Sequence, residues 1–378
     1  MSRSTLDTLD RLESLSLLAP GDRERLLAHD AVPWWLAALQ TLAAWIASLL
    51  LLSSFFAPAA LIGDGPLARG IAGALLCVLS ISLFRRDKLF TNQMALALSL
   101  AGQALLLSSV SDRFDDLLQG GRTVTAFGAL IALGMMLPRA NLHHRTICAL
   151  LALCHLALFV GPGAPLELLG TAVVACAAFL WSARPAWVTH RHAGLLGGLA
   201  RATGLAALIV PLAAGLPTAK AWLWFALGHG GPVFAPSMLS FGIALTFLAT
   251  VAHCGRGLAP ATRAAVLGCA GLLAFLAQAA PGVLAGATLF LACFQGTHRP
   301  LATLGLAAAV TYLGSFYYSL ETTLLLKSVV LAVSGLILLA LRAWLLRHGP
   351  TDAGASSAEV PPKGPTTAVR STSASERS

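Results

Sequence analysis

Apolar residues occur along this chain in long runs that short polar breaks interrupt. The first run starts at Trp34 and the last ends near Leu346. Several runs are shorter than the roughly 20 residues that span a bilayer upright, and the 264–295 region is also compatible with a re-entrant pair. We expect one helix in each run, near residues 34–56, 67–84, 89–110, 123–137, 146–160, 167–183, 196–216, 237–254, 264–280, 282–295, 301–317 and 322–346.

The composition indicates that these predicted helices span a membrane. Hydrophobic residues make up 57% of the 378 residues and charged residues 11%, whereas an average soluble domain has roughly 25% charged residues. A soluble fold has too little polar surface to cover so much apolar side chain. We therefore predict an all-α fold, a polytopic transmembrane helix bundle of about 12 helices, with 10 to 12 compatible with the pattern.

Basic residues divide unevenly between alternate breaks. With the N-terminus inside, the inner breaks hold ten basic residues and the outer breaks four. Alternation that stays in phase across so many segments predicts cytoplasmic N- and C-termini. The net charge of +9 therefore reflects basic residues that set the orientation of the helices in the membrane, and we expect no nucleic-acid partner. The inner set is Arg85, Arg86, Lys88, Arg139, Arg145, Arg184, Arg191, Arg256, Arg263 and Arg299, and the outer set is Arg69, Arg113, Arg122 and Lys220.

Two polar segments flank the apolar region. Residues 1–33 have leucines spaced along one helical face and a break at Pro20–Gly21, which predicts a cytosolic amphipathic helical hairpin and no secretory signal. Residues 347–378 are rich in Ser, Thr, Pro, Gly and Ala, a composition that predicts a disordered cytosolic tail. Residues 34–346 form the predicted transmembrane domain between them.

Few ionisable or strongly polar groups fall inside the predicted spans, and each is a candidate functional residue because such groups are costly in lipid. Lys327 lies one turn into the last helix, where it either snorkels to water or pairs with an outer acid or phenol; Glu321, Tyr317, Tyr318 and Asp116 are the nearest candidates. His155 and Gln103 lie within the fifth and third helices. A single histidine in a helix is more often a hydrogen-bonded packing residue than a ligand.

The chain carries no recognisable catalytic signature. Nucleotide-binding, serine-hydrolase, zinc-protease and dinucleotide motifs are missing from the sequence. The seven cysteines lie in or beside apolar runs without a C-x-x-C pair, and the inner-loop histidines have no acid nearby. We expect no enzyme activity, no cofactor and no metal. The apolar but broken stretch at 217–237 predicts an interfacial helix, with a lid over a cavity as the alternative.

One stretch resembles a known family. From Tyr312 to Ser328 the chain reads YLGSFYYSLETTLLLKS: an aromatic cluster, a short polar break, and then Thr-Leu-Leu-x-Lys-Ser opening the final helix. This stretch resembles the bacterial membrane family known as domain of unknown function 4401. The resemblance implies a bacterial inner-membrane protein without an assigned activity. It also implies a companion membrane protein that carries a Gly-Asp-Tyr motif.

Two classes of function fit these observations best. The leading hypothesis is a non-enzymatic assembly partner or scaffold in a membrane complex, and the alternative is a small-molecule or lipid transporter. A membrane enzyme acting on lipid or glycan is a weaker third. A transporter should have a polar cavity near the middle of the membrane lined by groups such as Gln103 and His155, whereas a scaffold should have a filled bundle. The sequence identifies the lipid bilayer as a partner and no small-molecule substrate.

Overall fold

The computed structural model describes residues 65–86, 88–114, 120–138, 140–161, 163–215 and 237–319, together with residues 10, 13, 35–36, 39–47 and 50 and five residue pairs between 328 and 343. Throughout this part the regular structure is helical and contains no strand. The helices are α4 (Pro66–Phe84), α5 (Leu89–Phe114), α6 (Gly120–Met136), α7 (Leu142–Val160), α8 (Ala164–Ser182), α9 (Arg184–Trp187), α10 (Ala193–Gly215), α12 (Ser237–Cys254), α13 (Pro260–Leu276), α14 (Pro281–Gln295) and α15 (Arg299–Ser319).

These helices confirm the all-α class and its membrane character. Each helix predicted between residues 67 and 317 has its counterpart, and six helices are long and apolar enough to cross a membrane. Three apolar helices, at 121–136, 260–276 and 281–295, are shorter. The first and last predicted helices are described only in parts, and those parts are helical. The terminal hairpin, apart from Asp10 and Glu13, and the C-terminal tail lie outside the described residues.

Helix starts were predicted too late in the middle of the chain. We expected a helix from residue 146, but α7 begins at Leu142, and its N-cap Asn141 accepts a hydrogen bond from the backbone N–H of His144 at 2.7 Å. Histidines in a polar stretch look like loop residues, yet His144 is buried in the first turn. The capping asparagine three residues earlier is the local signal for this start.

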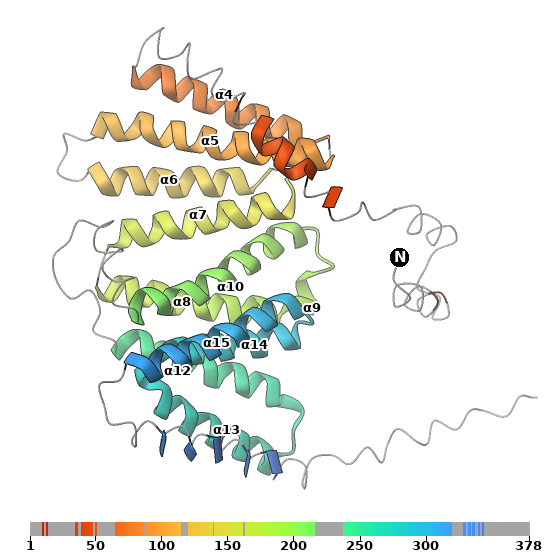
Figure 1. Cartoon of the computed structure of the whole chain (residues 1–378), viewed down its shortest axis with the longest axis vertical. Helices are drawn as coiled ribbons and strands as arrows, with labels where there is room; N and C mark the ends of the chain where they lie inside the picture. The colour runs from red at the N-terminus through yellow and green to blue at the C-terminus, as the bar shows by residue number, and fades with distance from the viewer. Residues whose placement is uncertain are drawn as a thin grey trace, which may run out of the picture.

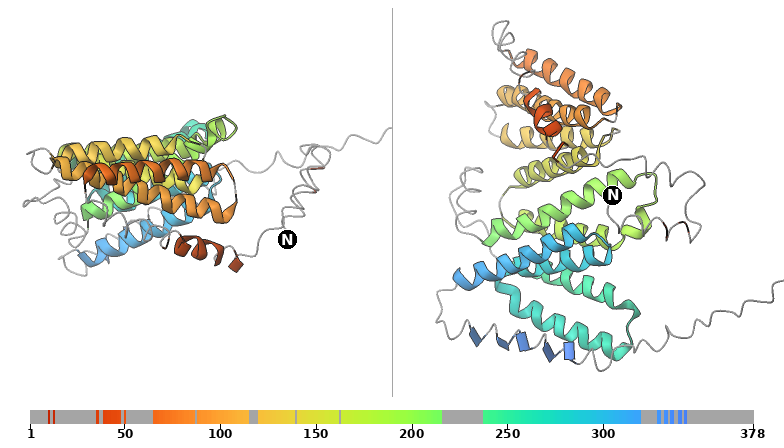
Figure 2. Two further views of the ribbon diagram at one scale, coloured as in Figure 1. Left: turned by 90° about the horizontal axis from the view of Figure 1, so that it is seen from above. Right: turned by 45° about the vertical axis from the view of Figure 1, so that its right-hand side comes forward.

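The helices are stacked largely in chain order. Figure 1 shows α4, α5, α6 and α7 one below another, followed by α8 with α10 and then α12 with α14 and α15, while α13 lies at the far end. The right-hand view of Figure 2 shows the same succession as an elongated array, and the left-hand view looks down on it from above. Consecutive helices run in opposite directions, so the turns after α4, α6, α8, α12 and α14 share one end of the array.

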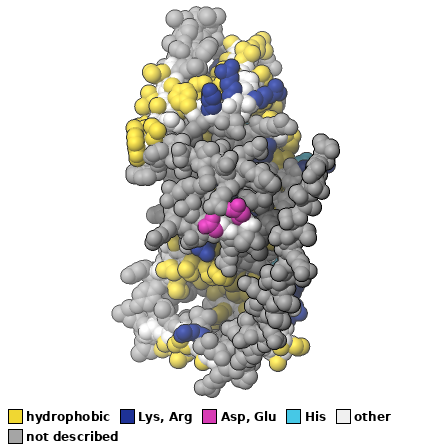
Figure 3. Space-filling view, turned by 90° about the vertical axis from the view of Figure 1, so that its right-hand side faces the viewer, with side chains coloured by type: hydrophobic (Ala, Val, Ile, Leu, Met, Phe, Trp, Pro, Cys, Tyr) yellow, Lys and Arg dark blue, Asp and Glu magenta, His cyan; other side chains and the backbone are white. Residues whose placement is uncertain are grey.

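That end carries most of the described basic side chains, and we call it the basic end. Figure 3 looks onto it and shows Lys and Arg side chains distributed among hydrophobic ones. The opposite end has Arg69, Arg122 and the buried Glu167 in the first turns of α4, α6 and α8. Basic residues of the described chain at the basic end are Arg85, Arg86, Lys88, Arg145, Arg184, Arg191, Arg256, Arg263 and Arg299.

Small residues hold neighbouring helices close. A Cβ added to Gly73 of α4 would lie 2.8 Å from the carbonyl oxygen of Gly102 in α5. A Cβ on Gly286 of α14 would lie 2.7 Å from the carbonyl oxygen of Gly305 in α15. Backbones can approach this closely only where side chains are missing, which is the usual basis of tight helix pairs in lipid.

Tyr312, the first residue of the Tyr312–Ser328 stretch, joins two helices of the fold. Pro211 lies inside α10 and lacks the backbone N–H that a helix residue normally donates. The phenolic hydroxyl of Tyr312 in α15 donates a hydrogen bond to the carbonyl of Leu208, one turn before the proline. Gly282 of α14 provides the space, since any Cβ there would strike the Tyr312 ring. The tyrosine therefore joins α15 to α10 one turn before Pro211.

Candidate functional site

A buried polar ladder connects α5 with α7. The Oγ of Ser99 lies 2.8 Å from Nε2 of His144, and the amide of Gln103 donates to Ser99 Oγ at 3.1 Å. The same amide lies 3.6 Å from the sulfur of Cys148, which is 3.4 Å from His144 Nε2. None of the four side chains is more than 8% exposed. The ladder is therefore a closed hydrogen-bonded set inside the membrane domain.

The spacing of these residues explains the ladder. Ser99 and Gln103 are four apart on α5, and His144 and Cys148 are four apart on α7, so each pair presents one helical face. Ser99 Oγ accepts from Gln103 and shares a second hydrogen bond with His144 Nε2, whose direction is set by the tautomer of the imidazole ring. Each polar group thus has a partner, which offsets much of the cost of burying it in an apolar surrounding.

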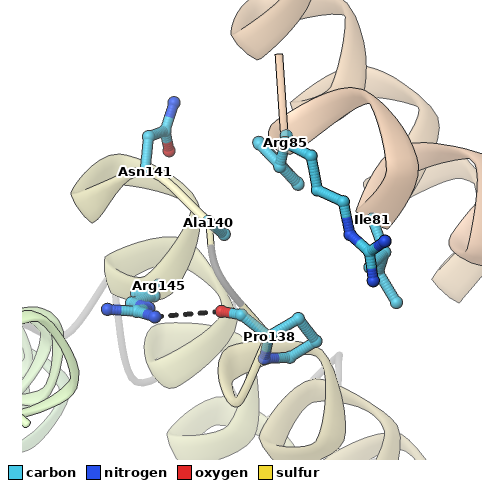
Figure 4. Close-up of a pocket in the computed structure, with 7 residues that line it drawn as sticks. Ile81, Arg85, Pro138, Ala140, Asn141 and Arg145 are labelled. Atoms are coloured by element: carbon cyan, nitrogen blue, oxygen red, sulfur yellow. Dashed lines mark hydrogen bonds between the residues drawn. The ribbon is translucent and has the colours of Figure 1, made fainter. Parts of the chain in front are cut away.

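A cavity of about 890 Å³ opens next to the ladder at the basic end. It lies between the end of α4 and the turn that leads into α7, as Figure 4 shows. Phe84 and Asn141 border both features: the Phe84 ring is 4.6 Å from the His144 ring, and Asn141 caps the His144 backbone. The residues around the cavity are Ile81, Phe84, Arg85, Pro138, Ala140, Asn141 and Arg145.

Arg145 is the best-anchored basic group of the cavity. Its Nη2 donates to the carbonyl of Pro138 at 3.0 Å, a bond drawn in Figure 4. On its other side it packs against α10, where added Cβ atoms at Gly194 and Gly198 would lie 2.2 and 2.7 Å from its side chain. Its Nε is buried without a hydrogen-bond partner. The guanidinium therefore has a fixed position and an unused donor.

A second basic cluster surrounds the turn between α14 and α15. Arg184 donates to the carbonyl of Gly296 and, at 2.9 Å, to Oγ1 of Thr297. The His298 ring packs against Trp181 in a tilted arrangement with ring centroids 4.5 Å apart, and its Nδ1 accepts the backbone N–H of Leu301 at 3.3 Å. Burial, together with the nearby charges of Arg201 and Arg184, lowers the pKa of His298. These contacts cap α15 and hold the turn against α8.

At the opposite end, Glu167 joins α8 to α12. Its side chain is 3% exposed, and Oε2 accepts the backbone N–H of Leu239 at 3.1 Å in the first turn of α12. A carboxylate at a helix N-terminus satisfies an otherwise unpaired N–H and complements the helix dipole. Glu167 is therefore a cap between two helices.

The sequence-predicted candidates have separate positions. Gln103 belongs to the ladder. His155 lies elsewhere on α7, where its Nδ1 donates to the Leu151 carbonyl at 2.7 Å and its ring faces Gly128 of α6. Lys327 and Glu321 lie outside the described residues. Tyr317 and Tyr318 belong to the last turns of α15, and their side chains lie outside the described part.

Sequence reasoning missed the partners of Gln103. Ser99 and Cys148 are ordinary small residues of apolar helices, and His144 and Arg145 were assigned to a loop. The only sequence signal for the ladder is the matched spacing of four on both helices. Within the described residues, no group of three or more His, Cys, Asp or Glu side chains could hold a metal ion.

The six helices that are long and apolar enough to cross a membrane define a multi-pass helical membrane protein. Residues 33–348 match the family described as domain of unknown function 4401, and the chain belongs to that family. This confirms the resemblance seen in the Tyr312–Ser328 stretch. No curated protein and no solved structure matches the chain.

Proposed function

We propose that this protein is a non-enzymatic assembly partner or scaffold of a membrane complex. The observation that carries the proposal is the hydrogen bonding of Gln103 and His155. Gln103 donates to Ser99 and Cys148 within the closed ladder, and His155 bonds to its own helix. The groups expected to line a transport cavity instead join and fill the helix array.

A bacterial inner membrane with cytoplasmic termini is the proposed setting. The concentration of Arg and Lys at the basic end supports this orientation, because cytoplasmic loops carry an excess of basic residues. Within this arrangement residues 1–33 form a cytosolic helical hairpin and residues 347–378 an unstructured cytosolic tail. A companion membrane protein is the proposed partner.

A lipid or small-molecule transporter is the second candidate. The cavity beside Arg145 favours it, because the cavity adjoins a line of polar side chains that leads from the basic end into the membrane domain. In that case Gln103 would be needed for movement of the substrate. In a scaffold its role is limited to holding α5 against α7.

The test compares capture of a companion with transport. The tagged full-length chain is extracted from its native membrane in mild detergent, and bound proteins are quantified by mass spectrometry against an unrelated polytopic protein with the same tag. We expect a membrane protein in near-stoichiometric amount, with equal yield from folded Gln103→Leu protein. Recovery of no protein above the control, together with Gln103-dependent uptake by reconstituted vesicles, would overturn the proposal in favour of transport.

A further inference from the structure

Helix α10 carries a charged side chain well inside the membrane domain. Its apolar segment Ala193–Pro211 contains one charged residue, Arg201, whose Cα lies eight residues, or about 12 Å, from the start of the helix. In the other five helices that are long enough to cross a membrane, any charged residue lies within four positions of an end of the apolar segment. A charge at the depth of Arg201 is costly and calls for a compensating interaction. The charged residues near segment ends are Arg69, Arg145, Glu167 and Arg256.

No acid compensates Arg201 in the part of the chain that the structure describes. Its side chain makes no hydrogen bond or ion pair with another described residue. The acidic residues of helices α4 to α15 are Asp112, in the last turn of α5, and Glu167, in the first turn of α8. Both lie at the end of the array opposite the basic end, and Glu167 already accepts the backbone N–H of Leu239. The described helices therefore leave the charge of Arg201 unbalanced.

The surroundings of Arg201 add positive charge. Helix α10 begins at the basic end, and Cα–Cβ bonds tilt toward the start of a helix, so the side chain leans toward that end. There its charge acts on the imidazole ring of His298, as the charge of Arg184 does. Arg184 is held in place by its bonds to the Gly296 carbonyl and to Oγ1 of Thr297. An anion that approaches Arg201 therefore meets a positive potential to which a second, fixed guanidinium contributes.

The guanidinium of Arg201 is also accessible from the lipid. Arg201 is half-buried, and its nitrogens are not enclosed as the Nε of Arg145 is. Ile209, two turns further along the same side of α10, is 61% exposed, so acyl chains contact this side of the helix. Lipid phosphates lie toward the basic end, which is the direction in which the side chain leans. A protein carboxylate would instead have to come from a second membrane helix at the same depth.

We propose that Arg201 binds the phosphate of an anionic phospholipid whose acyl chains lie along α10. An anionic headgroup fits better than a zwitterionic one, because the latter would bring a cation to a region where Arg184 and Arg201 have no acid beside them. The inference does not depend on the scaffold proposal, since a bound lipid is compatible with a scaffold or a transporter. It assigns a ligand class to the charge inside α10.

Arg201→Gln is the decisive variant. Because Arg201 has no partner among the described residues, its removal leaves no known protein group unpaired, and the lipid-free variant should be at least as stable as the wild type. Arg191→Gln is the matched control, since Arg191 is exposed in the turn before α10 and its Nε donates to the adjacent His192. Arg201→Lys keeps the charge but loses the planar fork.

The measurement is native mass spectrometry of the full-length protein in detergent, titrated with phosphatidylglycerol or phosphatidylcholine. We expect a phosphatidylglycerol adduct that weakens about tenfold in Arg201→Gln, consistent with the loss of a charge-assisted hydrogen bond, and less than twofold in Arg191→Gln. Arg201→Lys should lie between Arg201→Gln and the wild type. In thermal unfolding, phosphatidylglycerol should raise the melting temperature of the wild type more than that of Arg201→Gln, and inorganic phosphate should not.

Four results would overturn the proposal. Equal affinity for the two lipids would remove the requirement for an anionic headgroup, and equal losses in Arg201→Gln and Arg191→Gln would show a diffuse charge effect. Stabilisation by inorganic phosphate as large as that by phosphatidylglycerol would show binding of the free ion. A lipid-free Arg201→Gln protein that unfolds below the wild-type temperature, or that loses a co-purified membrane protein while binding phosphatidylglycerol normally, would show that Arg201 pairs with a protein group.

Discussion

The packing of α14 against α15 rests on a glycine, and replacing Gly286 with alanine tests it. An alanine Cβ at this position would lie 2.7 Å from the carbonyl oxygen of Gly305 and 2.8 Å from the backbone nitrogen of Ala309. Optimal contacts between non-bonded heavy atoms lie at about 3.5–4.0 Å. The neighbours are main-chain atoms, so no side chain can rotate away and the two helices must move apart.

The expected cost follows from this geometry. Overpacking a well-filled site by one methyl group costs about 1–3 kcal/mol. Alanine also improves helix propensity over glycine by about 1 kcal/mol, which partly masks the loss. Gly268 of α13 provides the control, because a Cβ there meets nothing within 4 Å. The difference in unfolding free energy between Gly286→Ala and Gly268→Ala should therefore be about 1–3 kcal/mol.

Thermal unfolding in a mild detergent, followed by intrinsic fluorescence or light scattering, measures this difference. Gly268→Ala should unfold at or slightly above the wild-type temperature, and Gly286→Ala several degrees below Gly268→Ala. Gly286→Leu should fail to form the pair at all. Equal melting temperatures for the two alanine variants would refute the close α14–α15 contact and the packing argument built on it.

Gln103→Leu removes two contacts of the ladder and should lower the free energy of unfolding by about 0.5–2 kcal/mol. A denaturant titration measures this loss, and an unchanged midpoint of the unfolding transition would contradict the ladder. Because the pKa of folded His298 is lowered, the unfolded chain takes up a proton first as the pH falls below about 6.5. The stability that neutral His298 contributes is thus present above that pH and lost below it. His298→Asn, which keeps a capping acceptor, should flatten the melting-temperature profile between pH 7 and 5, and parallel profiles would exclude this role. The sequence predicts that Lys327 is paired, so Lys327→Met should lower the free energy of unfolding in detergent on the order of a few kcal/mol, whereas Lys327→Arg should not. Lys220→Met is the control and should leave this free energy unchanged. A wild-type melting temperature for Lys327→Met would contradict the predicted pairing.

The helix pattern was largely readable from the chain alone. Apolar runs and their polar breaks predict α4 to α8, α10 and α12 to α15, because lipid exposes every helix to an apolar surrounding and a span must be apolar around its whole circumference. The short helix α9 lies in a predicted break and was not expected. The errors fall at helix starts, where polar residues are compatible with a loop or a capped first turn. His144 is the clearest case, since burial and the Asn141 cap place it inside α7.

The candidate site was predictable only in fragments. Gln103 stood out because an amide is unusual in a span, but Ser99 and Cys148 carry no such signal. Arg85 and Arg145 are 60 positions apart in the sequence, and we interpreted them there as independent topology charges. Only the juxtaposition of the α4 end with the α7 start places both around one cavity. The capping role of Glu167 likewise depends on a contact with the first turn of α12, which is distant in the sequence.

By itself, the sequence determined the membrane class, the succession of helices and the unequal distribution of basic residues. Each of these depends on local composition and on the partition of side chains between water and lipid. The order in which helices stack, the glycine contacts and the placing of Arg85 and Arg145 around one cavity were decided by tertiary structure. Every span is apolar on all sides, so hydrophobicity does not tell one helix face from another. Shape and hydrogen bonding between neighbours choose the face that packs.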